Sequence, residues 1–399
     1  MIAWARARAG KTVRETRGPL NGQGKWRARR MVGGVELASL KTRQVKRRRA
    51  RTSDCRPAAA GGWRRSSSGP AVNATTPRQA RRGHARRRFL NAFRVEIDLQ
   101  RLRLSDREKI GGVGMPGRVI SVLNMKGGVG KTTISAHVMR LFYLYRQKKV
   151  LLIDFDAQFN LSQTVLTQAQ YDDLKNKGRT IYEVMEPSPS VGLIDVAVTK
   201  QPPPATNDVI LRLKQTTDEV SYLDLLPGNF SLVKYSIVSN QTKLDSVKLR
   251  FQRFVSQSRK EYDLVVIDCN PSSSFITMCA LGVSDNVLVP VRPDKYSMLG
   301  LKILHEYVNQ MADIDPKPEF NIVLNGIPRQ GYQTNVEDEL RADPEFGPRV
   351  LTSKLYESKI LAASADYTGF ATDKKVPYRG RVRDNVLEVV AELAGVWKL

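Results

Sequence analysis

The sequence predicts an α/β protein whose sheet is doubly wound and mostly parallel. Short apolar runs of strand length alternate along the chain with segments of helical periodicity, a pattern typical of parallel sheets. Nearly every one of these runs ends in a polar residue that favours a turn. A glycine-rich loop separates the first apolar run from the first helical segment. Since ligands of open α/β sheets bind beyond the carboxyl ends of the strands, a ligand site is expected there.

The elements follow in order from these runs. The first strand is expected over residues 119–124, which are apolar and rich in β-branched side chains. A helix is expected to open at Lys131, because apolar residues then recur at helical spacing. Later strands are expected over 150–153, 222–226, 264–267, 286–291 and 321–324. The residues that follow these five strands, and are expected to converge on the ligand, begin with Asp154, Pro227, Asp268, Arg292 and Asn325.

The loop between the first strand and the first helix reads Lys126-Gly127-Gly128-Val129-Gly130-Lys131-Thr132-Thr133. It fits the phosphate-binding pattern G-x-x-x-x-G-K-[ST], except that Met125 stands at the first glycine. Glycines let backbone N–H groups turn inward, and the helix N-terminus adds partial positive charge. Lys131 is expected to reach the β- and γ-phosphates and Thr132 to bind Mg²⁺. An ordinary glycine turn is the alternative, but the flanking strand and helix favour a P-loop NTPase sheet.

Three aspartates at strand ends are candidates for the chemistry. Asp268 follows four apolar residues, as does the aspartate that holds Mg²⁺ in phosphate-loop enzymes, although turn formation or helix capping would also place an aspartate there. Asp154 and Asp156 alternate at the end of another strand. We expect both near the phosphates, one organising the metal shell and the other orienting the attacking water.

Charge divides the chain into two parts. Residues 1–114 contain 30 lysines and arginines against 7 acidic residues, which leaves only +3 of the total +26 for residues 115–399. The first part lacks apolar periodicity, so it is expected to be largely disordered, with a short helix possible over 89–110. A start codon assigned upstream of the true start at Met115 is the favoured explanation. A nucleic-acid-binding arm and a transit peptide are the alternatives.

Other features restrict the class of protein. Cys55, Cys269 and Cys279 show no C-x-x-C spacing, so neither a disulfide framework nor a zinc site is expected. Apolar runs stay short of a membrane span, so a soluble protein of a reducing compartment is expected. Residues 382–399 carry apolar residues at helical spacing. Because acidic residues occupy the polar face, a helix docked on the core is favoured over a membrane-targeting one.

These motifs resemble those of the ParA/MinD ATPases. Residues 126–133 look like that family's deviant Walker A motif, K-G-G-x-G-K-T-T, and residues 154–160 resemble its D-x-D-P-Q-G-N segment, with Ala157 and Phe159 replacing Pro and Gly. Further ParA-like segments follow in the family's order, at residues 180–185, 226–229, 268–271 and 289–293. The resemblance runs from about residue 116 to about residue 367 and favours the ParA branch.

The resemblance implies a mechanism. ATP with Mg²⁺ would lie between two protomers, and Lys126 of each would reach the phosphates bound by the other. Asp156 would orient the water with support from Asp154, while Pro293 and Asn325 would contact the nucleotide. It also implies slow turnover until a ParB-like partner stimulates it, no membrane binding, and a cytoplasmic, nucleoid-associated protein of DNA partitioning or cargo positioning. An ATP-gated repressor and a redox or metabolic relative on the same fold are the alternatives.

ParA-like proteins bind DNA without sequence preference through basic residues near the C-terminus. Basic residues scattered over a solvated face are the alternative explanation for the same residues here. The candidates in this chain are Arg349, Lys354, Lys359, Lys374, Lys375, Arg379, Arg381 and Arg383.

Overall fold

The computed structural model describes residues 116–399, apart from 188–191, 193–194, 273, 363–367 and 374–376. The expected basic segment 1–114, its possible helix over 89–110, Cys55, Lys374 and Lys375 lie outside the described residues.

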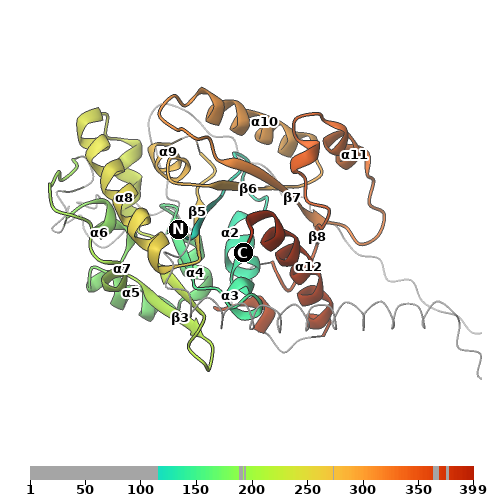
Figure 1. Cartoon of the computed structure of the whole chain (residues 1–399), viewed down its shortest axis with the longest axis horizontal. Helices are drawn as coiled ribbons and strands as arrows, with labels where there is room; N and C mark the ends of the chain where they lie inside the picture. Colours follow the sequence, from blue (N-terminus) through green and yellow to red (C-terminus); the bar gives the residue numbers. More distant parts are fainter. Residues whose placement is uncertain (1–115, 188–191, 193–194, 273, 363–367, 374–376) are drawn as a thin grey trace, which may run out of the picture. The chain divides into compact units, whose positions relative to one another are not determined.

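A doubly wound sheet of eight strands in the order β3-β4-β2-β5-β1-β6-β7-β8 forms the centre of the domain, as predicted (Figure 1). All neighbouring strands pair in parallel except β3, which pairs antiparallel with β4. The strands are β1 Arg118–Val122, β2 Val150–Phe155, β3 Leu211–Gln215, β4 Tyr222–Leu226, β5 Leu264–Cys269, β6 Asn286–Val291, β7 Glu319–Ile327 and β8 Leu355–Tyr356.

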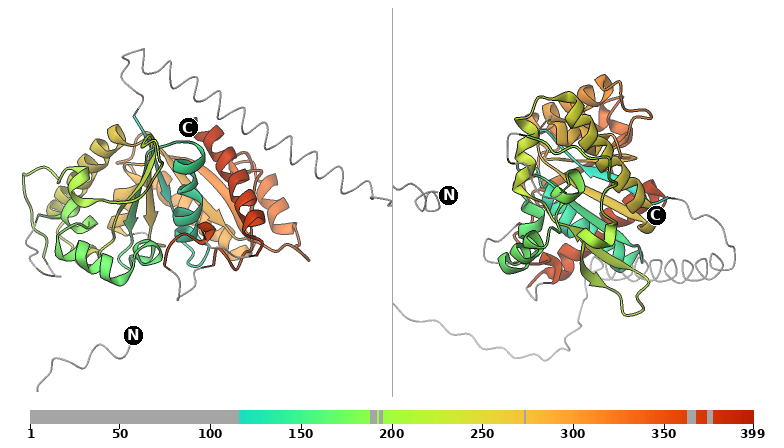
Figure 2. Two further views of the ribbon diagram at one scale, coloured as in Figure 1. Left: turned by 90° about the horizontal axis from the view of Figure 1, so that it is seen from below. Right: turned by 90° about the vertical axis from the view of Figure 1, so that its left-hand side faces the viewer.

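Helices cover both faces of this sheet (Figure 2). The central strands therefore bury apolar side chains on both sides, in two separate cores. In β2, for example, Leu151 and Ile153 face one apolar core while Val150 and Leu152 face the other. The helices of the first core are α6 Ile181–Met185, α7 Thr206–Val209, α8 Gln241–Glu261, α9 Phe275–Leu281, α10 Lys295–Gln310, α11 Asn335–Ala342 and the 3₁₀ helix η2 Phe230–Ser236.

The second core lies under the helical segment that follows the glycine loop. That segment opens at Lys131 as predicted, but a π-helical stretch interrupts it, so that it consists of α2 Lys131–Ile134, η1 Ser135–Met139 and α3 Leu141–Tyr145. Such π-helical insertions occur frequently at functional sites. The other elements on this side are α4 Asn160–Val165, α5 Gln168–Asn176, the 3₁₀ helix η4 Ala371–Asp373 and α12 Arg379–Trp397; the 3₁₀ helix η3 Gly347–Arg349 precedes β8.

The C-terminal helix α12 docks on the second core, as the sequence analysis favoured. Val386, Val389 and Leu393 are buried, and Trp397 stacks on Phe142 with ring centroids 5.8 Å apart. Within the part of the chain that the structure describes, no helix combines the length and the apolar character needed to cross a membrane.

Two strands were not predicted. β3 alternates Leu211 and Leu213 with charged residues at the edge of the sheet, and β8 has only two residues. The predicted strands at 222–226 and 286–291 match β4 and β6. The predicted strand 119–124 corresponds to β1, which starts one residue earlier and ends at Val122. The other predicted strands are longer in the structure, and β2 and β5 extend through Asp154 and Asp268.

Candidate nucleotide site

The glycine loop turns through two backbone conformations that favour glycine. Gly128 and Gly130 have φ of 74° and 95°, in the left-handed region. Gly130 also leaves no room for a side chain, since an added Cβ would lie 2.2 Å from Asn325 Nδ2. That amide donates a hydrogen bond of 2.7 Å to the Val129 carbonyl. Asn325, near the end of β7, thus holds the glycine loop in this conformation.

Lys131 lies inside this loop. Its side chain is buried, and its ammonium donates to the Lys126 carbonyl at 3.3 Å. Burial lowers the pKa of the ammonium, and the nearby carboxylate of Asp268 acts in the opposite direction. An ammonium has three donors, so the group can bind phosphate oxygens in addition to this carbonyl.

Thr132 and Asp268, the two predicted Mg²⁺ ligands, lie together. The Thr132 hydroxyl donates to Asp268 Oδ2 at 2.8 Å, and Ser135 donates to the other carboxylate oxygen at 2.7 Å. Burial raises the pKa of Asp268 to about 6, against the effect of these two hydrogen bonds. A hydroxyl and a carboxylate beside a phosphate loop fit Mg²⁺, a hard cation that is bound through few protein oxygens together with phosphates and water.

Asp154 and Asp156 occupy different environments. Asp156 lines the cavity, and its Oδ1 accepts hydrogen bonds from Gln158 N at 2.9 Å and Asn270 Nδ2 at 3.2 Å. Asp154 is fully buried behind the cavity lining and accepts two hydrogen bonds from Ser162. Burial, and then the charge of Asp268, raise the pKa of Asp154 to about 8. Of the two carboxylates, Asp156 is therefore the one that faces the cavity.

Lys126 points away from the cavity. Its ammonium contacts both carboxylate oxygens of Asp294, at 2.7 and 2.9 Å, and Ser297 Oγ at 3.3 Å. It also lies 5.7 Å from the ring centre of Tyr296, within cation–π distance. Asp294 caps α10 by accepting from Ser297 N at 2.9 Å. The two lysines of the loop thus have separate surroundings, one inside the phosphate cradle and one on the first turn of α10.

A cavity of about 880 Å³ opens beside the loop. That volume suits a nucleotide, since small-molecule sites span about 300–1,000 Å³. Asn325 and Arg292 line it, whereas Pro293, the other residue that the resemblance implied as a nucleotide contact, is not among the lining residues. The C-terminal segment around Tyr356 and residues 368–371 forms the opposite wall. From the loop itself, Gly127, Gly128, Gly130, Lys131, Thr132 and Thr133 line the cavity.

The predicted DNA-contacting residues have diverse surroundings. Lys354 forms an ion pair with Glu337 at 2.8 Å, and Arg349 contacts His305 Nε2 at 3.1 Å. Lys359 is exposed. Lys354 and Arg349 thus have partners within the protein, which would compete with a phosphate for their donors.

Several residues of the site were not predicted. Ser135 and Asn270 contact Asp268 and Asp156, and His137 lines the cavity from the π-helical stretch η1. Ser135 follows the loop on the first turn of its helix, so its spacing from Thr132 could have indicated it. The contact between Asp294 and Lys126 could not be predicted from spacing, because the two residues come together only when β1 and β6 pair side by side.

Comparisons with known proteins agree with this geometry. A family model described as an AAA domain matches residues 117–322. The sporulation initiation inhibitor protein Soj of Bacillus subtilis is 32% identical over 212 residues, covering 53% of this chain and 71% of Soj. The chromosome partitioning protein ParA of Myxococcus xanthus is 27% identical over 235 residues, with coverage of 56% and 71%.

Among solved structures, the complex of Cyanothece McdA(D38A) with ATP superposes with a TM-score of 0.51 at 16% identity, covering 70% of this chain and 98% of McdA. At that identity the likeness concerns the fold. The family match, the identity with Soj and the two-lysine loop between β1 and α2 agree with one another. The chain therefore belongs to the ParA/MinD-type family of P-loop ATPases.

Proposed function

We propose that this protein is an ATPase that dimerises on ATP and acts in DNA partitioning or cargo positioning. Soj and the M. xanthus ParA, whose names refer to sporulation control and chromosome partitioning, support this assignment through their identity with the chain. Membership of the family supports ATPase activity at a general level. Dimer formation, hydrolysis and DNA binding by this chain are part of the proposal.

The observation that carries the proposal is the separation of the two loop lysines. Lys131 is buried in the cradle and lines the cavity, whereas the Lys126 ammonium lies outside it on Asp294. A single protomer therefore satisfies the phosphates with Lys131 and leaves Lys126 for another task. A cation supplied from a second protomer can neutralise charge on a transferring phosphoryl group, as arginine fingers do.

Within one protomer, Thr132 and Asp268 would hold Mg²⁺, which would supply positive charge against the phosphates of ATP. Asp156 would accept a hydrogen bond from the attacking water and orient it toward the γ-phosphate. The position of Asp156 on the cavity wall, held by Gln158 and Asn270, supports this role. Asp154 does not line the cavity, so it would support Asp156 indirectly, through its contacts inside the protein.

DNA binding in the ATP state is the second part of the proposal. Besides Lys359, the first residues of α12 include Arg379, Arg381 and Arg383, two of which are exposed. Basic side chains at a helix N-terminus add to the positive end of the helix dipole, which favours phosphate. A ParB-like activator would raise the slow turnover, and binding to chromosomal DNA would make the protein nucleoid-associated.

The test of the central claim is the variant Lys126→Ala. ATP affinity measured on the monomer should stay within about threefold of the wild type, because Lys131 supplies the cation in cis. The ATP-dependent dimer should disappear in light scattering with Mg²⁺ and a slowly hydrolysed ATP analogue. Lys177→Ala is the matched control, since Lys177 also pairs with an aspartate, Asp173, on the surface of α5. A full dimer in the Lys126→Ala variant would contradict the role in trans.

DNA binding is tested separately with the unmodified protein. Retention on non-specific duplex DNA is expected with ATP and Mg²⁺, and little retention with ADP or without nucleotide. Affinity should fall as salt rises, since phosphate contacts release counterions. Equal retention in all three nucleotide states would refute ATP-gated DNA binding, and retention on one sequence alone would favour a repressor.

A further inference from the structure

The buried carboxylate of Asp154 accepts both of its hydrogen bonds from a single residue. Its Oδ2 accepts hydrogen bonds from Ser162 N at 2.7 Å and from Ser162 Oγ at 2.6 Å. Ser162 lies in α4 and is itself fully buried. Neither residue lines the nucleotide cavity. Whatever Asp154 contributes to the reaction, it contributes through its contacts inside the protein.

The same hydroxyl also holds the turn that follows β4. Gly228 N donates to Ser162 Oγ at 2.9 Å. This glycine is required by close approach, since an added Cβ would lie 2.8 Å from Asp154 Cγ and 2.7 Å from Phe159 Cβ. The Gly228 carbonyl in turn accepts from the Tyr171 hydroxyl at 3.2 Å. The turn after β4 therefore closes directly against the segment that carries Asp156.

That segment depends on an unusual backbone conformation. Phe159 has φ of 43°, in the left-handed region, which is costly for an aromatic residue. Its amide donates to the Asp156 carbonyl at 2.9 Å, so the two residues close one turn. Tyr171 stacks on Phe159 with ring centroids 4.8 Å apart and planes within 1° of parallel. The orientation of Asp156 thus relies on neighbours that hold Phe159 in place.

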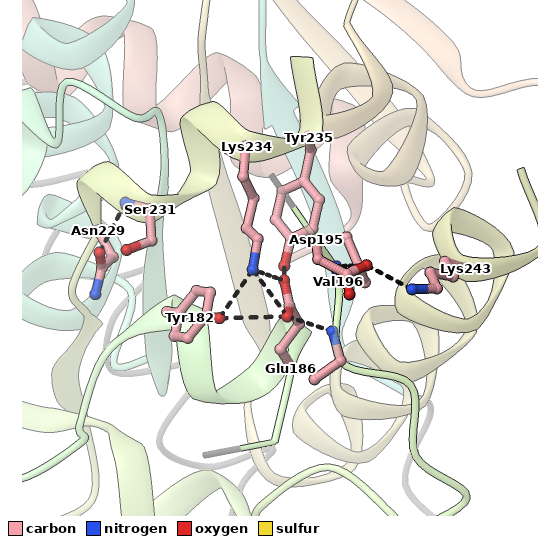
Figure 3. A network of polar contacts seen from close by, with 10 residues as sticks. Tyr182, Glu186, Asp195, Val196, Asn229, Ser231, Lys234, Tyr235 and Lys243 are labelled. Carbon is pink, nitrogen blue, oxygen red and sulfur yellow. Dashed lines mark hydrogen bonds and ion pairs between the residues drawn. The ribbon is translucent and has the colours of Figure 1, made fainter. Parts of the chain in front are cut away.

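On its other side the β4 turn continues into a network of polar contacts (Figure 3). Asn229 donates to Thr180 Oγ1 at 2.9 Å and accepts from Ser231 N at 2.9 Å. Beyond it, Lys234 and Glu186 form an ion pair of 2.9 Å in which both side chains are fully buried. The hydroxyl groups of Tyr182 and Tyr235 donate hydrogen bonds to Glu186 at 3.3 and 2.7 Å and complete this α6–η2 cluster.

A buried ion pair with satisfied hydrogen bonds resists rearrangement, because separating its partners leaves an uncompensated buried charge. The α6–η2 cluster therefore gives the β4 turn a fixed position. Ser162 joins this turn to Asp154 on β2, the strand that leads to Asp156. With the Ser162 hydroxyl in place, the loop of residues 156–159 is held between the ends of β2 and β4.

We propose that Ser162 is a positioning residue for ATP hydrolysis, which acts by holding Asp154 and Gly228 together and so fixing the loop that carries Asp156. The inference rests on the proposed role of Asp156 in orienting water. Without the hydroxyl, Asp154 keeps one of its two hydrogen bonds from Ser162, and Gly228 N loses its acceptor. Phosphate binding is expected to stay intact, because among the described residues the side-chain hydrogen bonds of Ser162 go to Asp154 and Gly228 and none joins it to the glycine loop or Lys131.

The test compares Ser162→Ala with Ser162→Thr, which retains the hydroxyl. In Ser162→Ala we expect kcat to fall about tenfold or more, since small displacements of a catalytic group can cost up to about 100-fold. KM and the ATP Kd should stay within about twofold of the wild type. In Ser162→Thr we expect kcat within about threefold of the wild type. The control is Ser258→Ala, which removes a fully buried serine hydroxyl of α8 that donates to Phe254 O at 3.0 Å.

Two results would overturn the inference: an unchanged kcat in Ser162→Ala, or an equal loss in Ser162→Thr. Tyr171→Phe keeps the stack on Phe159 but loses the bond to Gly228 O, and we expect about a threefold lower kcat at unchanged KM. This variant decides the matter if Ser162→Ala is unstable. Asp156→Ala is measured in parallel. Retained turnover there would refute the proposed function, whereas its loss together with unaffected Ser162 and Tyr171 variants would refute only the inference.

Discussion

Lys126 is held by Asp294 in the single protomer. If Lys126 acts in trans, as we propose, that contact must break before the ammonium reaches a second protomer. The two groups are partly exposed, with side-chain exposures of 32% and 37%, so the pair itself contributes little to stability. The hydrogen bonds from Lys126 and Ser297 lower the pKa of Asp294 against the opposing effect of desolvation, which is the largest single influence. The contact therefore keeps an ionised partner beside Lys126 at neutral pH.

Replacing Asp294 tests whether this contact restrains the dimer. In Asp294→Asn the ammonium loses its charged partner, while the amide oxygen can still cap α10. We expect the ATP-dependent dimer to form at about a threefold to tenfold lower protein concentration, since an exposed pair is worth up to about 1 kcal/mol. Analytical ultracentrifugation with the ATP analogue measures this. Asp173→Asn on α5 is the control, and a weaker dimer in Asp294→Asn would show that Asp294 supports the assembly.

Asp154 makes the nucleotide-free protein sensitive to pH. Its folded-state pKa of about 8 lies above its ordinary value near 4, because burial and Asp268 disfavour the charge. A raised folded pKa means that stability is fully present below the ordinary value and is lost as pH rises toward 8. Asp154→Asn carries no charge to bury. Its Tm advantage over the wild type should grow by at least about 5 °C between pH 5 and pH 8.

Differential scanning calorimetry without Mg²⁺ or nucleotide measures that difference. The carboxylate of Asp268, whose pKa is raised to about 6, changes stability in the same direction in both proteins, so the comparison isolates Asp154. A Tm difference independent of pH would contradict the burial of an ionisable group at this position.

The sequence could predict those site residues that are set by local pattern. Lys131 and Thr132 follow from the glycine loop, and Asp268 follows from an apolar run that ends in a carboxylate. Ser162 could not be predicted, since its role depends on β2 and β4 lying side by side and on Gly228 approaching Asp154. Arg292, which begins the segment after a predicted strand, lines the cavity, whereas Pro293, which the resemblance implied as a nucleotide contact, does not.

Among the elements, the buried central strands were the predictable ones, since apolar runs flanked by turn residues leave little choice. The edge strands were not. β3 carries Arg212 and Lys214, and its pairing with β4 relies partly on the contact of Arg212 with Asp224. Charged side chains on an edge strand discourage pairing with other chains. They also interrupt the run of apolar residues from which a strand is predicted, so β3 was missed. The interrupted helix after the glycine loop also has no sequence signal that we could identify.

The helix α12 shows how a terminal element supports the site. Trp397 is 1% exposed, and its Nε1 donates to Asn321 Oδ1 at 2.8 Å, which joins the last turn of α12 to β7. β7 leads to Asn325, which holds the glycine loop. Trp397→Ala should lower the free energy of unfolding by about 3–5 kcal/mol through loss of buried area and packing. Urea denaturation followed by circular dichroism measures the change.

The exposed neighbour Val396 is the matched control, since it is 42% accessible and Val396→Ala should cost less than about 1 kcal/mol. At low temperature both variants should still bind ATP. A neutral Trp397→Ala variant would mean that the end of α12 is dispensable for the fold.

At the scale of the whole chain, the change in charge lies just before the first described strand. The basic excess belongs to residues 1–114, whereas the described elements begin with β1 at Arg118. The chain enters the domain at Gly117, whose amide donates to the Arg259 carbonyl at 2.7 Å and whose carbonyl accepts from Arg259 Nε at 3.1 Å. An added Cβ at Gly117 would lie 1.8 Å from the Tyr262 carbonyl oxygen. Among the described residues, Gly117 thus joins the start of β1 to the end of α8.

We therefore propose residues 115–399 as the ATPase domain, and deletion of residues 1–114 tests this division. The shortened protein should fold, bind ATP and form the ATP-dependent dimer with the same midpoint as the full chain. If residues 1–114 play no part in DNA binding, the DNA affinity of the shortened protein at moderate salt should equal that of the full chain and remain ATP-dependent. If residues 1–114 act as a basic arm, the deletion should weaken DNA binding while leaving ATP turnover unchanged.

The salt dependence separates these two outcomes. Each phosphate contact adds about 0.9 to the slope of log affinity against log salt, so loss of a basic arm that makes several contacts should flatten the slope by several units. Equal slopes for both proteins would show that residues 1–114 make no contribution to DNA binding. A shortened protein that fails to fold would refute the domain boundary itself, because it would place part of residues 1–114 in the core that β1 and α8 form around Gly117.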